Sequence, residues 1–186
     1  MRIFIAIDLD EAVIDNLAGL QSEMRSECNY GKGEVKWVKP EQMHLTLKFL
    51  GEVEDNRVME VCSAVNRACL GHERFSIEIC GAGSFGRPAR VVWAGVEKSE
   101  ELFGLHSDIE DELESAGWDR DRRGFSGHLT LCRVKSVGAG RELGRAAAGF
   151  EDFEGGMSFV ESVKIYSSVL GKMGPEYSVV SEIELE

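Results

Sequence analysis

The sequence predicts a mixed α/β protein that folds as one compact unit with two quasi-equivalent lobes. The main observation is a tetrapeptide, His-Leu-Thr-Leu, that occurs at residues 44–47 and again at residues 128–131. The copies are 84 residues apart (128 − 44), close to half of the 186-residue chain. Each half also combines alternating apolar stretches, typical of strands, with apolar residues at helical spacing. We therefore expect one domain over residues 1–186, made of two pseudo-symmetric lobes.

Apolar periodicity predicts the individual elements. Helical spacing of apolar residues predicts helices over residues 13–24, about 55–70, 102–113 and 141–148. Alternation and short apolar runs predict strands over residues 2–8, 35–38, 44–51, 75–79, 91–96, 159–169 and 177–185, with a further strand at the second tetrapeptide. Asp8 or Asp10 is expected to cap the first helix. Residues 81–86 are expected to form a glycine-rich turn, and residues 171–175 the turn of a final hairpin.

The composition limits the classes of protein that fit. The chain is 43% apolar, as in globular proteins, and its net charge of −12 comes from 21 basic and 33 acidic residues. This charge argues against broad neutralisation of duplex nucleic acid, although a small site for one phosphate or a strand end is still compatible. The chain has no membrane-length apolar run, no signal-peptide layout and no Cys-x-x-Cys pair among its five cysteines. We expect a cytoplasmic monomer without membrane association.

The repeated tetrapeptide places an imidazole and a hydroxyl side by side. In a strand, residues i and i+2 share a face, so His44 lies beside Thr46 while the two leucines bury the other face. The second copy repeats this arrangement with His128 and Thr130. Because packing alone poorly explains a duplicated histidine, we interpret both pairs as functional.

Three kinds of chemistry compete for these pairs. A metal site needs at least three ligands, and no acidic residue accompanies either motif at ligand spacing. A hydroxyl nucleophile activated by histidine needs an orienting carboxylate and an elbow-like turn, and neither copy has them. The third alternative is a general acid and base acting together on a phosphodiester, since imidazole titrates near neutrality. The threonine hydroxyls would then hold the non-bridging oxygens. The sequence favours this third alternative, with a strained cyclic phosphate as the substrate and with no metal or other cofactor.

The residues resemble a known family, the two-histidine (2H) phosphoesterases. More narrowly, they resemble the LigT-like RNA 2′,3′-cyclic phosphodiesterases, also called 2′-5′ RNA ligases. Besides the two His-x-Thr-x motifs, the resemblance rests on segments distributed over the whole chain: residues 2–7, Trp37, 48–51, 85–86, 90–95, 125–133, 166–168 and 174–177.

The resemblance implies a bilobal α/β (α+β) fold, in which two antiparallel sheets line a central V-shaped cleft and helices pack outside. It implies metal-independent hydrolysis of a 2′,3′-cyclic phosphate at RNA or nucleotide ends to a 2′-phosphate. It assigns His44 as the proton donor and His128 as the proton acceptor. The alternatives are 2′-5′ RNA ligation at the same site in reverse, and a non-catalytic nucleotide-binding module. Retention of both histidines and both threonines argues against the latter.

Arg133 matches the arginine that follows the second motif in the family, and a guanidinium suits phosphate. Strict alternation puts it on the face opposite His128, so it reaches the cleft only if the strand bulges or ends there. A surface salt bridge is the alternative for Arg133. Gly127 stands where the family usually has proline. Cys132 is an even number of residues after His128, so strict alternation puts both side chains on the same face of the strand.

The remaining candidates have weaker support. Phe49 and Trp93 could stack on a base or pack in the core. His72 and His106 lack a threonine at i+2 and are expected to be ordinary surface residues. A local cationic rim could come from several residues: Lys36, Lys39, Lys48, Arg87, Arg90, Arg120, Arg122 and Arg123.

Overall fold

The structure, a computed structural model, describes residues 1–171 and 174–186. Within them the strands are β1 Arg2–Ile7, β2 Val35–Trp37, β3 Leu45–Glu52, β4 Phe75–Phe85, β5 Val91–Val96, β6 His128–Val134, β7 Glu154–Val160, β8 Ser162–Gly171 and β9 Gly174–Glu184. The α-helices are α1 Glu11–Glu27, α2 Val58–Cys69, α3 Glu100–Ser115 and α4 Val137–Ala148, and short 3₁₀ turns cover Pro40–Gln42 and Asp55–Arg57.

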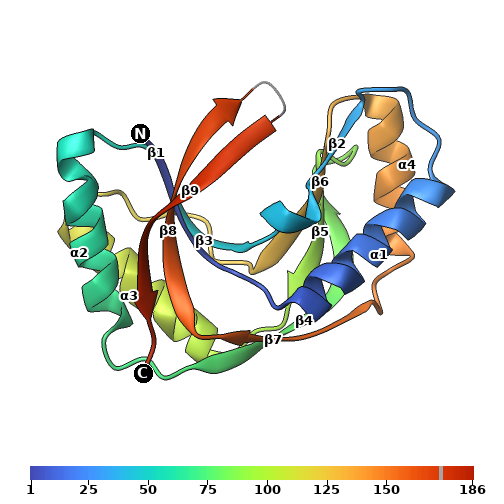
Figure 1. The fold of residues 1–186 in the computed structure, drawn as a ribbon. Helices are drawn as coiled ribbons and strands as arrows, with labels where there is room; N and C mark the ends of the chain where they lie inside the picture. Colours follow the sequence, from blue (N-terminus) through green and yellow to red (C-terminus); the bar gives the residue numbers. More distant parts are fainter. Residues whose placement is uncertain (172–173) are drawn as a thin grey trace.

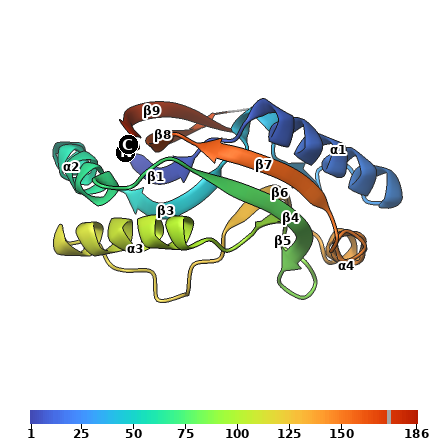
Figure 2. The ribbon, with the colours of Figure 1, turned by 90° about the horizontal axis from the view of Figure 1, so that it is seen from below.

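Two antiparallel sheets form the framework (Figures 1 and 2). One has the strand order β3-β1-β8-β9 and the other has the order β2-β6-β5-β4-β7. The helices α2 and α3 pack together against the first sheet, through β9 and β3. The helices α1 and α4 cover the second sheet, α1 against β7 and α4 against β4 and β5. The predicted fold class, two antiparallel sheets with helices packed outside, is confirmed.

Both halves of the chain contribute strands to each sheet. The order β3-β1-β8-β9 in the first sheet parallels β6-β5-β4-β7 in the second, where β2 is an additional edge strand. The two motif strands, β3 and β6, therefore occupy equivalent places, beside β1 and β5. The helix that follows β1 packs on the second sheet, whereas the helix that follows β5 packs on the first. A pseudo-symmetric pair of interleaved lobes remains our proposal, and this shared order supports it.

The helices form where their apolar stripes predict them. In α1 the buried side chains include the predicted stripe from Val13 to Met24, and in α3 they include the stripe from Leu102 to Leu113. Asp10, one of the two residues predicted to cap α1, occupies the N-cap position, but its side chain makes no hydrogen bond to the first turn. Its Oδ2 accepts instead from the backbone N of Phe159 at 2.8 Å, which ties the start of α1 to β7.

Three predicted boundaries were wrong. Residues 81–85 continue β4, and Gly83 is required there because a Cβ would lie 2.5 Å from the Trp93 ring. Residues 159–169 are two strands, since the chain leaves one sheet for the other around Glu161. The fourth helix begins at Val137, where the Ser136 hydroxyl accepts from the third residue of the helix. The predicted hairpin turn at 171–175 includes residues 172–173, which lie outside the described residues.

A buried ion pair connects β3 to the second half of the chain. Lys48 Nζ lies 2.7 Å from Glu110 Oε2 on α3, and their side chains are 8% and 3% exposed. Lys48 also donates to the carbonyl of Asp119 at 2.8 Å, while the Asp121 amide donates to Glu110 Oε2 at 3.1 Å. The prediction that Lys48 belongs to a cationic rim was therefore wrong. Instead, Lys48 anchors the loop that leads from α3 to β6.

We expect Glu110→Ala to lower the free energy of unfolding by about 3–5 kcal/mol, because it leaves the Lys48 ammonium buried without a counter-charge. Chemical denaturation measures this loss. The matched control is Glu112→Ala on the same helix. Its carboxylate lies 2.7 Å from Arg67, but that pair is 35% and 49% exposed, so the expected loss is at most about 1 kcal/mol. Equal losses in the two variants would contradict a special role of the buried pair.

Candidate active site

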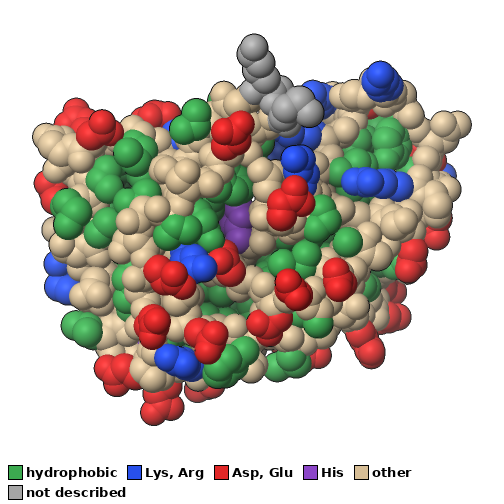
Figure 3. Space-filling model, viewed as in Figure 1, with side chains coloured by type: hydrophobic (Ala, Val, Ile, Leu, Met, Phe, Trp, Pro, Cys, Tyr) green, Lys and Arg blue, Asp and Glu red, His purple; other side chains and the backbone are tan. Residues whose placement is uncertain are grey.

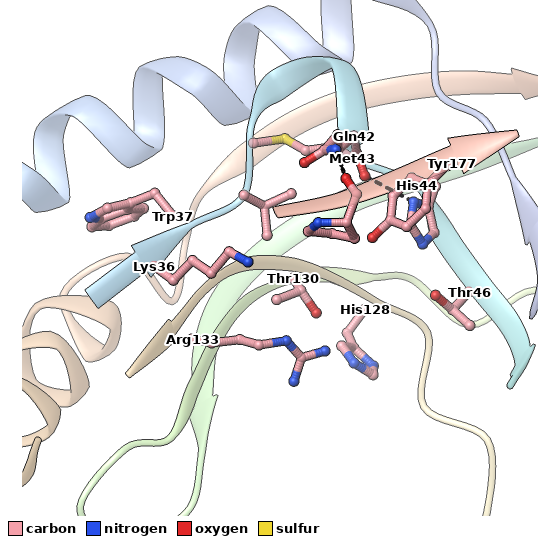
Figure 4. Close-up of a pocket in the computed structure, with 12 residues that line it drawn as sticks. Lys36, Trp37, Gln42, Met43, His44, Thr46, His128, Thr130, Arg133 and Tyr177 are labelled. Carbon is pink, nitrogen blue, oxygen red and sulfur yellow. Dashed lines mark hydrogen bonds between the residues drawn. The ribbon is translucent and has the colours of Figure 1, made fainter. Parts of the chain in front are cut away.

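A pocket lies between the two sheets and is lined by residues from both. Figure 4 shows this pocket in close-up. Figure 3 shows one face of the molecule, with a histidine visible in a hollow near its middle. All five residues singled out from the sequence line it: His44, Thr46, His128, Thr130 and Arg133. The other lining residues are Lys36, Trp37, Val38, Gln42, Met43, Pro175 and Tyr177. The structure thus brings two motifs 84 residues apart into one cavity.

His44 is fixed by a backbone carbonyl and two aromatic rings. Its Nδ1 lies 2.9 Å from the carbonyl oxygen of Gln42, and a carbonyl can only accept, so Nδ1 donates. Phe4 stacks on the imidazole at 4.8 Å between ring centroids, and Tyr177 meets it edge-on at 5.5 Å. Gln42 is the last residue of the 3₁₀ turn that begins at Pro40, and this turn places its carbonyl beside the imidazole.

His128, in the other sheet, is held by the same kind of hydrogen bond to a backbone carbonyl. Its Nδ1 donates to the carbonyl oxygen of Ser126 at 2.8 Å, again two residues earlier in the chain. The ring of Phe85 meets the imidazole edge-on at 5.0 Å. In both histidines Nδ1 is thus occupied, and Nε2 is the nitrogen left to accept or donate a proton.

The surroundings of His44 change its acidity. Burial, chiefly, lowers the pKa of His44 below the ordinary 6.5, because desolvation penalises the charged imidazolium. The bond to the Gln42 carbonyl and the negative charge of Asp8 oppose this shift without cancelling it. The neutral imidazole with a free Nε2 is consequently favoured in the pocket as it stands.

A bulge brings Arg133 to the face of His128. Thr130 and Cys132 pair with adjacent residues of β5, so Leu131 is an extra residue in β6. Leu131 and Cys132 are both fully buried, and Arg133 is exposed again on the pocket side. Arg133 was expected to reach the cleft only if the strand bulged or ended there, and the strand does bulge. Cys132 lies in the core, and burial raises the pKa of its thiol to about 12.

The same bulge occurs in the first motif strand. Thr46 and Lys48 pair with adjacent residues of β1, which makes Leu47 the extra residue. Leu47 and Lys48 are both buried, and Phe49 is 54% exposed. The sequence argument missed the bulge in β3 and therefore included Lys48 among the candidates for a cationic rim.

The pocket has an electrostatic character opposite to that of the whole chain. Although the net charge is −12, the described lining residues contain no Asp or Glu, and they include Lys36 and Arg133. Thr46 and Thr130 contribute hydroxyls beside the two histidines (Figure 4). Such a lining offers cations and neutral donors to an anion, and no carboxylate that would repel it.

Sequence reasoning missed Gln42 and Tyr177 as parts of the pocket. Gln42 Nε2 donates to the carbonyl of Pro175 at 2.6 Å, which ties the turn before β3 to β9. Burial raises the pKa of Tyr177, while the positive charge of Arg133 opposes that shift. The segment 174–177 was noted only as part of the family resemblance, and its closeness to His44 depends on the pairing of distant strands.

Of the remaining candidates, His106 differs from expectation, whereas Trp93 follows the packing alternative. His106 was expected on the surface, but its ring stacks on Phe125 at 4.0 Å and its Nε2 lies 3.7 Å from Glu110 Oε1. Trp93 packs against Gly83 and Phe85 on the sheet face that carries His128. Neither His106 nor Trp93 lines the pocket.

Within residues 1–171 and 174–186, no group of three or more His, Cys, Asp or Glu side chains is arranged to hold a metal ion. Among the same residues, no helix is both long enough and apolar enough to span a membrane.

Comparisons with known proteins agree with this fold. The profile of the family described as LigT like Phosphoesterase matches residues 7–93. The chain is 34% identical over 180 residues to an RNA 2′,3′-cyclic phosphodiesterase of Methanothermobacter thermautotrophicus, covering 96% of this chain and 95% of that protein. It is 35% identical over 188 residues to an RNA 2′,3′-cyclic phosphodiesterase of Thermotoga maritima, covering 100% and 96%.

Solved structures show the same architecture. The protein TT0787 of Thermus thermophilus superposes with a TM-score of 0.80 at 27% identity, covering 100% of this chain and 98% of that one. LigT of E. coli, crystallised with 3′-AMP, superposes with a TM-score of 0.79 at 22% identity, covering 99% and 97%, which supports the fold alone. The chain therefore belongs to the LigT-like phosphoesterases. Within that family, the curated relatives compared above are RNA 2′,3′-cyclic phosphodiesterases.

We expect Tyr177→Ala to raise the pKa of His44 toward 6.5, because removing the ring admits water to a buried imidazole. NMR titration of the histidine Cε1–H signals measures it, with the His44 signal assigned by its loss in His44→Gln. Phe159→Ala removes a 47% exposed ring on β7, outside the pocket, and is the control that should leave the His44 titration in place. An unchanged His44 pKa in Tyr177→Ala would contradict burial as the cause.

Proposed function

We propose that this protein hydrolyses a 2′,3′-cyclic phosphate at RNA or nucleotide ends to a 2′-phosphate. The observation that carries the proposal is the pair of imidazoles in one pocket, each with Nδ1 bonded to the carbonyl two residues before it. This arrangement leaves two Nε2 atoms for proton transfer, and the lining threonines and arginine suit a phosphate. The curated relatives named for this activity support it independently.

The chemistry follows from two opposed proton-transfer groups. Water attacks phosphorus, and Nε2 of His128 accepts its proton. The bond from phosphorus to the 3′ oxygen breaks on the opposite side, and Nε2 of His44 gives its proton to that oxygen. The product has a 3′ hydroxyl and a 2′-phosphate, and the two histidines have exchanged protonation states. Each transfer is typically worth about 10²- to 10⁴-fold in rate.

The remaining polar side chains stabilise the charge that develops on phosphorus. The hydroxyls of Thr46 and Thr130 donate to non-bridging oxygens, and the Arg133 guanidinium can bind two of these oxygens in parallel. A strained ring makes the cyclic phosphate reactive enough for this donor set to suffice without a metal ion.

Two alternatives use the same pocket. Ligation of a 5′ hydroxyl end onto the cyclic phosphate runs through the same two histidines with an RNA hydroxyl in place of water, so both reactions belong to one site. A non-catalytic nucleotide-binding module would not need two histidines that each keep Nε2 free. Hydrolysis is the activity that the pocket supports best.

The direct test is hydrolysis of a 2′,3′-cyclic nucleotide in excess EDTA, with the products separated by chromatography. Wild-type protein should produce the 2′-phosphate at the same rate with and without EDTA. His44→Ala and His128→Ala should each lose at least about 10²-fold in kcat, because each removes one proton-transfer group.

His72→Ala is the matched control for these variants, since His72 bonds to Asp108 on α3 and lies outside the pocket. Circular dichroism of all variants verifies folding. Loss of activity in EDTA would point to a metal-dependent reaction, and near-wild-type rates in either pocket variant would rule out the paired mechanism.

The pH dependence tests the direction of proton transfer. As the donor, His44 must be protonated, and burial lowers its pKa below 6.5. In His128→Ala, where His44 is the pocket histidine that remains, the protonated fraction of His44 falls as the pH rises through that lowered value, so the residual kcat/KM should decline above a pKa lower than 6.5. Adding Tyr177→Ala should move this decline to higher pH. A residual rate that instead rises through that pKa would show that His44 acts in its neutral form and is the acceptor.

A further inference from the structure

Two cations face each other across the β2–β6 ladder at one end of the pocket. Lys36 on β2 is the direct register partner of Arg133 on β6. Both side chains are exposed, and both line the pocket that holds the histidines. Residues directly opposite in an antiparallel pair have Cβ atoms about 4.5–5.5 Å apart, so these two side chains leave the sheet as close neighbours.

This pairing is unfavourable unless something negative is bound. Like charges opposite each other destabilise a sheet. Among the described residues, neither Lys36 nor Arg133 has a carboxylate within 4.0 Å, although the chain has 33 acidic residues. By contrast, Lys164 on β8 has a carboxylate partner, Asp8, at 2.8 Å. The sheet therefore keeps two unneutralised positive charges together inside the pocket.

The two side chains extend in the direction of the catalytic pair. Figure 4 shows both of them reaching from the β2–β6 edge toward Thr130 and His128, with Arg133 nearer His128. Lys36 Nζ also reaches the start of β9, where it lies 3.4 Å from the position a Cβ would take on Gly174. The ammonium thus lies between β2 and the start of β9, on two different sheets.

We propose that Lys36 forms a second phosphate subsite, which binds the phosphodiester on the 5′ side of the cyclic phosphate, while Arg133 bridges the two phosphates. This inference rests on the proposed function and specifies its substrate class. The preferred substrate is the cyclic 3′ end of an RNA strand of two or more nucleotides, rather than a cyclic mononucleotide. An ammonium suits this task because a phosphodiester offers a point charge in every nucleotide and carries no sequence information.

The test compares three substrates with 2′,3′-cyclic ends: a mononucleotide, a dinucleotide with a normal phosphodiester, and the same dinucleotide with an uncharged methylphosphonate linkage. Wild-type protein should prefer the charged dinucleotide over the uncharged one in kcat/KM. Lys36→Gln should reduce this preference about three- to fivefold, the effect of one solvent-exposed charge contact. Lys36→Arg should restore it.

Salt dependence provides a second readout. For the charged dinucleotide, the slope of log kcat/KM against log salt concentration should fall in magnitude by about 0.7 in Lys36→Gln, as expected when one phosphate contact to a single strand is lost. Lys98→Gln is the matched control. It makes the same change in net charge at an exposed lysine in the loop before α3, outside the pocket, and should keep the wild-type preference and slope.

The outcomes separate this subsite from the proposed function. Hydrolysis of all three substrates with equal efficiency would overturn the subsite and leave the cyclic phosphodiesterase activity intact. An equal change in preference in Lys36→Gln and Lys98→Gln would also overturn it, because the effect would then come from net charge. No hydrolysis of any substrate would overturn the proposed function itself and the subsite with it.

Discussion

The bulge after each His-x-Thr motif is the constraint on which the rest of the cleft depends. Without it, alternation would send every second residue of β3 and β6 to the same face. With Leu47 and Leu131 as extra residues, two consecutive side chains enter the core and the next one returns to the side of the histidine. Bulges re-aim side chains in this way and increase local strand twist. The pocket thus gains Arg133 from a strand whose plain register would have hidden it.

The same backbone device has different consequences in the two sheets, because the side chains at equivalent places differ. The second buried residue is Cys132 in β6 and Lys48 in β3. A thiol packs in a core at little cost, whereas an ammonium needs a counter-charge, which Glu110 supplies from α3. That pair, through the backbone of Asp119 and Asp121, also holds the loop that continues toward β6. The buried charge of Lys48 in the first sheet thereby helps to hold the loop that leads to the motif strand β6 in the second sheet.

The sequence predicted the elements well where the information was local, and failed where it depended on pairing. Apolar stripes located α1 and α3, because each stripe is read along one segment. The duplicated motif indicated that His44 and His128 share one site, because the same pair of side chains recurs in both halves of the chain. The faces of Lys48 and Arg133 depend on which residues of β1 and β5 they oppose, and no local pattern reports that register. The continuation of β4 through residues 81–85 likewise depends on the ring that covers Gly83 from the next strand.

Identical motifs end in unlike surroundings, and this difference bears on their roles. Phe4 and Tyr177 enclose His44, whereas His128 has one aromatic neighbour and a cationic strand end beside it. After the bulge, β3 presents Phe49 where β6 presents Arg133, and of these two only Arg133 lines the pocket. A substrate with one phosphate at the histidines and another beside Arg133 would be oriented by that difference. In the proposed mechanism the repeated tetrapeptide supplies the matched proton-transfer groups, and the residues around each copy would decide which end of the substrate each one meets.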